Sequence, residues 1–130
     1  MNIPQRYVLT GNPANGHFVN LFQFKTADGA GRIDPIWALH INDADPAHWY
    51  LQMIWGDGGF TGAGPQSGDN VSRKAYTQTI KELPVGSWFH LEAYLSQSNA
   101  FGGQLTIWQD GVQIFDFTSV KTSYNNCAYN

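Results

Sequence analysis

The run from Trp88 to Leu95 combines the residue types from which proteins build carbohydrate sites. Every second residue in it is aromatic or polar, in the order Trp88, His90, Glu92 and Tyr94, and the residues between them are apolar. Because side chains alternate between the two faces of a strand, this pattern predicts one apolar face and one aromatic and polar face. A pyranose stacks on an aromatic ring while polar side chains bond its hydroxyls, so a sugar site needs both residue types together.

Other segments carry side chains that suit the same face. Gln23, Lys25, His40, Thr106 and Trp108 all lie in stretches where apolar and polar residues alternate. If these stretches neighbour 88–95, one sheet face presents all of these groups. The predicted ligand-binding residues are Gln23, Lys25, His40, Trp88, His90, Glu92, Tyr94 and Trp108.

A purely structural role competes with this interpretation. Tryptophan is mostly buried in a small domain, where its N–H needs only one partner. Trp37 and Trp88 are therefore expected in the core or at a sheet edge, whereas Trp55 and Trp108 fit either role. The two histidines of the predicted site are also compatible with ordinary structural hydrogen bonding. Glu92 is harder to explain in this way, because a half-buried carboxylate needs a partner.

The elements that would position these residues are strands. Period-two alternation predicts strands at 18–25, 36–41, 49–55, 88–95, 105–109 and 112–117. Asp110-Gly111 joins the last two and predicts a tight hairpin, because both residues tolerate the positive φ of a primed turn.

Two further segments complete the prediction. Tyr76, Ile80 and Leu83 fit helical spacing within 72–83, but the segment is rich in strand formers, and we favour a strand. The segment 56–72 is rich in Gly and Ser and predicts a long surface loop.

Composition limits the fold and the partners. A chain of 130 residues with 42% hydrophobic and 13% charged residues predicts one folded domain, 1–130. Regularly spaced short strands indicate an all-β sandwich or barrel. The 7 Lys and Arg residues form no cluster, and the net charge is -3, so nucleic acid is not an expected partner. No apolar run is long enough to predict a membrane span. Cys127 is the only cysteine, which excludes an internal disulfide.

Four segments carry a family resemblance: FVNLFQFK at 18–25, DPIWALHI at 34–41, LPVGSWFHLE at 83–92 and LTIWQDG at 105–111. Together they resemble the concanavalin A-like polysaccharide lyases of the heparin-lyase and alginate-lyase kind, from about Phe18 to about Thr122. The resemblance implies an antiparallel jelly-roll β-sandwich and an extracellular or periplasmic location. The chain is shorter than most such proteins, as if terminal strands were absent or supplied by a partner. The VGSW and WQDG elements also occur in members without enzymatic activity.

The resemblance also suggests a lyase site. Such lyases neutralise a uronate carboxylate and abstract the adjacent proton with a base and an acid. Gln23 matches the neutralising residue, but Lys25 stands where a histidine is common, and lysine is a base near neutral pH only when desolvated. The catalytic tyrosine of the family follows the hairpin, where this chain has Tyr124 and Tyr129. A lyase would therefore use Gln23, Lys25, His90 and Tyr124.

Glycoside hydrolysis is not expected. It needs two carboxylates facing one sugar. Glu82 and Glu92 are the only glutamates, and they do not share a predicted strand.

Cofactors are not predicted, although calcium is an alternative. Asn42, Asp43, Asp45 and Asp57 could supply the oxygen ligands that calcium prefers. Turns rich in Asn and Asp are also common without any metal.

The sequence thus favours a domain that binds a polysaccharide or oligosaccharide. One alternative is a structural or interaction module that uses the same face for contact between subunits, as in a homo-oligomer, because unpaired strand edges attract partners. The other is a polysaccharide lyase acting on a uronate-containing glycan.

Overall fold

The computed structural model describes residues 1–3, 19–27, 33–42, 45, 47–56, 73–98, 100–120, 122–123 and 128–129. All regular elements in this part of the chain are strands. They are β1 (Val19–Ala27), β2 (Ile33–Asn42), β3 (Tyr50–Gly56), β4 (Arg73–Thr77), β5 (Leu91–Ser96), β6 (Gly103–Gln109), β7 (Val112–Val120) and β8 (Ala128–Tyr129). The predicted all-β class is confirmed.

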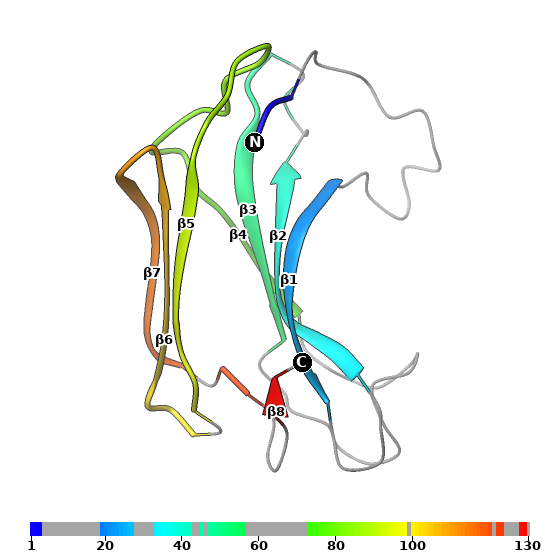
Figure 1. The fold of residues 1–130 in the computed structure, drawn as a ribbon, viewed down its shortest axis with the longest axis vertical. Helices are drawn as coiled ribbons and strands as arrows, with labels where there is room; N and C mark the ends of the chain where they lie inside the picture. The colour runs from blue at the N-terminus through cyan, green and yellow to red at the C-terminus, as the bar shows by residue number, and fades with distance from the viewer. Residues whose placement is uncertain are drawn as a thin grey trace.

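The strands form two antiparallel sheets (Figure 1). The larger sheet has the order β4-β3-β2-β1, and the two-residue strand β8 pairs with the end of β1. The smaller sheet has the order β5-β6-β7.

Side chains from both sheets form one hydrophobic core. The larger sheet contributes cross-strand pairs such as Leu39 with Met53, and both residues are fully buried. The smaller sheet contributes Leu105 and Ile107, which are also fully buried. Phe117 of β7, in the smaller sheet, packs against the larger sheet: its ring centroid lies 5.3 Å from that of Trp37 and 5.1 Å from that of Tyr76. The other buried residues of this core are Ile3, Trp37, Ile41, Trp49, Leu51, Leu83, Phe89, Ile114, Phe115 and Val120.

The predicted strands correspond to β1, β2, β3, β5, β6 and β7, with ends that differ by a few residues. In the segment 72–83, strand β4 is confirmed at Arg73–Thr77, while residues 78–83 are irregular. β5 begins only at Leu91, and Trp88 before it forms an isolated bridge with Asn2. The predicted loop 56–72 lies outside the described residues except for Gly56.

The Asp110-Gly111 hairpin between β6 and β7 is confirmed. Asp110 has a φ of 47° and Gly111 a φ of 76°. Two consecutive positive φ angles are those of a type I′ turn, whose twist matches the flanking strands.

Candidate functional site

The outer face of the smaller sheet carries the aromatic and polar residues predicted from the segment 88–95. Glu92 pairs with Trp108, and Tyr94 pairs with Thr106, across β5 and β6. The alternate residues of β6 face the core and are fully buried. Paired residues lie on the same face of a sheet, so Glu92, Tyr94, Thr106 and Trp108 are on the face away from the core, although Thr106 itself is only 2% exposed. We call this surface, with Trp88 and His90 at its margin, the outer face of the smaller sheet.

The aromatic residues of this face are accessible. Trp88 is 78% exposed and Tyr94 is 52% exposed, while Trp108 is half-buried. Trp37 and Trp88 were both expected in the core or at a sheet edge: Trp37 is fully buried in the core, whereas Trp88 is exposed beside the edge strand β5. The difference arises because Trp37 is central in a sheet and faces the other sheet, whereas Trp88 precedes an edge strand.

Polar side chains surround the aromatic ones. His90 Nδ1 lies 3.3 Å from Glu92 Oε1, and both side chains are mostly exposed. Further along the face, the Thr106 hydroxyl donates to Asp116 Oδ1 at 3.0 Å, and the Gln104 amide donates to Thr106 Oγ1 at 3.0 Å. The expectation that Glu92 is half-buried and therefore needs a partner is wrong, because its side chain is mostly exposed, although it does lie beside His90.

Sequence reasoning missed Gln104 and Asp116. Both belong to this face by register, since Gln104 pairs with Ser96 and Asp116 with Thr106. The alternation within β6 and β7 indicates that Gln104 and Asp116 each lie on the polar face of their strand. Only the register between the strands shows that they share the face of Glu92 and Tyr94.

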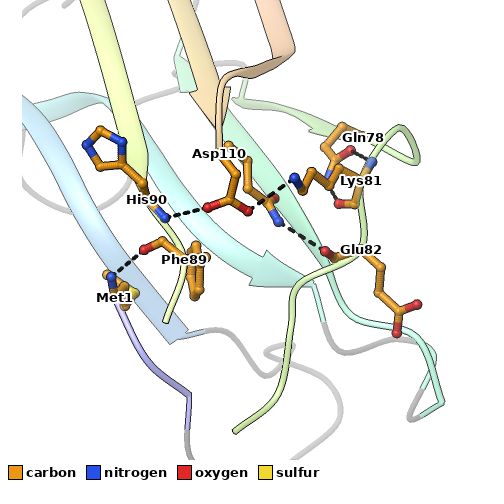
Figure 2. A network of polar contacts seen from close by, with 8 residues as sticks. Met1, Gln78, Lys81, Glu82, Phe89, His90 and Asp110 are labelled. Atoms are coloured by element: carbon orange, nitrogen blue, oxygen red, sulfur yellow. Dashed lines mark hydrogen bonds and ion pairs between the residues drawn. The ribbon is translucent and has the colours of Figure 1, made fainter. Parts of the chain in front are cut away.

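The Asp110 carboxylate fixes the backbone at His90 (Figure 2). The His90 N–H donates to Asp110 Oδ1 at 2.7 Å, and the Asp110 N–H donates to the His90 carbonyl oxygen at 2.9 Å. Lys81 Nζ lies 3.1 Å from Asp110 Oδ2. The His90 N–H and then the Lys81 ammonium lower the pKa of the Asp110 carboxyl, because both favour its charged form.

The N-terminal segment holds the neighbouring residue from the opposite side (Figure 2). The α-ammonium of Met1 donates to the Phe89 carbonyl oxygen at 2.6 Å, and the Phe89 N–H donates to the Met1 carbonyl oxygen at 2.8 Å. The backbone leading into β5 is therefore bonded on both of its edges.

Gln23 and His40 do not belong to this face. They lie on β1 and β2 of the larger sheet, so the expectation that all predicted site residues share one sheet face is wrong. Gln23 pairs with Ala38 and is half-buried, while His40 pairs with Gln52 and is 7% exposed. Alternation along a strand specifies its two faces, but it does not specify which strands are neighbours.

Of the four residues of the lyase hypothesis, the structure describes the side chains of Gln23 and His90, and these two belong to different sheets. Gln23 is on the larger sheet, whereas His90 precedes β5 of the smaller sheet. The Lys25 side chain and Tyr124 lie outside the part of the molecule that the structure describes.

A second polar cluster lies on the larger sheet. The Thr77 hydroxyl oxygen accepts hydrogen bonds from the amides of Asn42 and Gln52, each at 2.8 Å. Asn42 is one of the candidate calcium ligands. Here its side-chain amide bonds Thr77.

The other calcium candidates are only partly described. Asp45 Oδ1 accepts a hydrogen bond from the Ala47 N–H at 2.8 Å, which is an Asx-turn contact. Asp43 and Asp57 lie outside the described residues. Among the residues that are described, no group of three or more His, Cys, Asp or Glu side chains is arranged to hold a metal ion.

No protein-family model, curated protein or solved structure matches this chain. Over the described residues, the structure contains no helix of the length and apolar character needed to cross a membrane.

Proposed function

We propose that this chain is a carbohydrate-binding domain of the jelly-roll sandwich type, and that the outer face of the smaller sheet holds the polysaccharide. The observation that carries the proposal is the exposure of Trp88 and Tyr94 on a face that also contains Trp108. Tryptophan and tyrosine are enriched at binding surfaces, because each presents a large apolar ring together with a polar group.

The polar groups on this face suit sugar hydroxyls. Glu92 and Asp116 supply carboxylate oxygens that accept from hydroxyls, and Gln104 supplies an amide that both donates and accepts. Aromatic rings would stack on the apolar face of a pyranose while these groups bond its edge.

The charge of the face favours a neutral glycan. Glu92 and Asp116 are the acidic residues of this face, and the imidazole of His90, beside Glu92, is the one basic side chain among its described residues. A uronate carboxylate placed here would be repelled by like charges. The proposed ligand is therefore a neutral polysaccharide rather than the uronate-containing glycan that a lyase would need.

The test measures binding of soluble neutral glucans, mannans and xylans by isothermal titration calorimetry, with alginate as the acidic comparison. We expect saturable binding to at least one neutral polysaccharide. Trp88→Ala and Trp108→Ala should each weaken it by about tenfold, which corresponds to about 1.4 kcal/mol.

Phe101→Ala is the matched control. Phe101 is 73% exposed but follows the far end of β5, away from Trp88. Its removal should leave affinity unchanged, and circular dichroism should show that all three variants remain folded. Equal losses in all three variants, or no binding to any neutral glycan at high protein concentration, would refute the proposal.

A further inference from the structure

The edge of β5 that faces away from β6 is open in the described structure. β5 is the terminal strand of the smaller sheet, and β6 is its only partner among the described strands. An open edge presents a row of backbone N–H and C=O groups that can pair with another strand.

The hydrogen bonds of two residues, His90 and Phe89, determine which residues present these groups. The N–H and C=O of His90 point toward the β6–β7 hairpin, where they bond Asp110, and those of Phe89 point the other way, toward Met1. Backbone groups alternate in direction along an antiparallel strand. The groups of Glu92 and Tyr94 therefore face β6, and those of Leu91, Ala93 and Leu95 face the open edge.

The N-terminal segment already uses the start of this edge. Asn2 forms an antiparallel bridge with Trp88, and the Phe89 backbone bonds Met1 in both directions. An added strand that runs antiparallel to β5 would continue this ladder in line with residues 1–3.

The other outer edge of the smaller sheet is less regular. β5 pairs with β6 without a register shift, whereas β6 pairs with β7 with two shifts. Ser119 of β7 also has a φ of 56°, which twists the strand near its end. Bulges of this kind protect sheet edges from pairing, and the part of β5 beyond Phe89 has none.

Ala93 leaves room for a side chain at this edge. It pairs with Ile107, which is fully buried, yet Ala93 itself is exposed. Leu91 and Leu95 on either side pack against the core. A large apolar side chain opposite Ala93 would therefore extend the core.

We infer that the open edge of β5 accepts an extended peptide segment of another polypeptide, bound as an added antiparallel strand. The peptide that fits has an apolar residue opposite each of Leu91, Ala93 and Leu95, the largest opposite Ala93. Opposite Glu92 it has a lysine or arginine, and opposite Tyr94 a β-branched residue, because such cross-strand pairs are favourable.

The probe is the blocked synthetic peptide Val-Thr-Phe-Lys-Val, in which Phe would lie opposite Ala93 and Lys opposite Glu92. Amide hydrogen exchange followed by NMR measures binding. At a peptide concentration about ten times its Kd, exchange at Leu91, Ala93 and Leu95 should slow by about tenfold. Exchange at Glu92 and Tyr94, whose N–H groups already face β6, should change little.

Two methylated peptides provide matched controls. N-methylation of Phe removes an N–H that faces β5 and should abolish binding, whereas N-methylation of Lys removes one that faces away and should be tolerated. Equal binding by both methylated peptides, or uniform slowing along β5, would overturn the inference. The inference would also be overturned if amide exchange along β5 did not slow at the highest peptide concentration that stays in solution.

Ala93→Pro tests the edge in the protein. Proline at this position removes only an edge-facing donor and leaves the ladder to β6 intact. The variant should lose peptide binding and keep polysaccharide binding, whereas Trp108→Ala should do the reverse. Failure of one activity is thereby distinguishable from failure of the other, and retained peptide binding in Ala93→Pro would contradict the inference.

Discussion

Gly103 begins β6 at a point where the chain after β7 passes directly over its backbone. A Cβ on Gly103 would lie 2.5 Å from Thr122 Oγ1 and 2.7 Å from the Val120 carbonyl oxygen. Thr122 cannot easily move, because its hydroxyl donates to the Ser96 carbonyl oxygen at 2.8 Å and accepts from the Ser98 N–H at 2.7 Å. Gly103→Ala is expected to lower the free energy of unfolding by about 2 kcal/mol, as measured by urea denaturation.

Gly102→Ala controls for the loss of glycine itself. The nearest atom to a Cβ on Gly102 is Ser98 Oγ at 3.5 Å, which is an ordinary contact. This variant should stay within about 0.5 kcal/mol of the parent protein. Equal destabilisation by both substitutions would show that the Thr122 contact is not the cause.

Asp110 makes stability depend on pH in the acidic range. Its folded-state pKa is lowered, first by the hydrogen bond from the His90 N–H and then by Lys81. A depressed carboxyl pKa contributes stability that is complete above the unfolded value of about 4 and is lost as the pH falls through the folded value. Asp110→Asn should be less stable than the parent at pH 7 by about 0.5–1 kcal/mol, because a hydrogen bond to a charged group is lost but solvent screening at this partly exposed site weakens it.

The difference in stability between Asp110→Asn and the parent should shrink as the pH falls from about 4 through the lowered folded-state pKa, since the folded parent carboxyl also loses its charge there. Thermal unfolding between pH 2 and pH 7, that is on both sides of about pH 4, measures it. Lys81→Met should reproduce only a small part of the effect, because exposed ion pairs contribute roughly 0–1 kcal/mol. A constant difference at every pH would contradict this role of the carboxylate.

At the level of residues, the sequence predicted which side chains share a strand face but not how exposed each one is. Trp37 and Trp88 both sit in alternating segments, yet one is fully buried and the other is 78% exposed. Burial depends on which sheet covers the residue, and that is determined by contacts between distant segments.

The element that the sequence predicts best is the β6–β7 hairpin. Gly111 has a φ of 76°, and a Cβ added to it would contact nothing within 4 Å. Gly111→Ala should therefore lower the free energy of unfolding by about 1–2 kcal/mol through backbone strain alone. Gly111→Asn should cost less, because asparagine adopts this conformation more readily. Chemical denaturation measures both, and equal losses would show that something other than φ is responsible.

Local patterns explain why the hairpin was predictable and the sheet order was not. The Asp110-Gly111 turn is encoded by two adjacent residues, so its type can be inferred without tertiary information. The separation of Gln23 and His90 onto different sheets follows from strand order, about which period-two alternation carries no information. β8 has two residues, too few for any alternation to appear.

At the scale of the whole molecule, Phe117 joins the two sheets. Its ring contacts Trp37 of β2 and Tyr76 of β4, and it stacks on Phe115 with centroids 5.7 Å apart. Phe117→Ala should lower the free energy of unfolding by about 3 kcal/mol, because it removes contacts on both sheets and leaves a cavity. Thr118→Ala, at the exposed neighbouring position, should have little effect. If calorimetry showed the two variants to be equally stable, the shared core would not depend on this ring.

The opposed bonds at Phe89 and His90 have a consequence for the energetics of recognition. Met1 bonds the Phe89 backbone and Asp110 bonds the His90 backbone. The peptide group between Phe89 and His90 therefore cannot rotate without breaking one of these hydrogen bonds. Trp88 and Glu92, which bracket this peptide group, are thereby presented on a preorganised scaffold. The protein would then lose little conformational entropy when it binds a ligand, so a larger part of the contact energy would contribute to affinity.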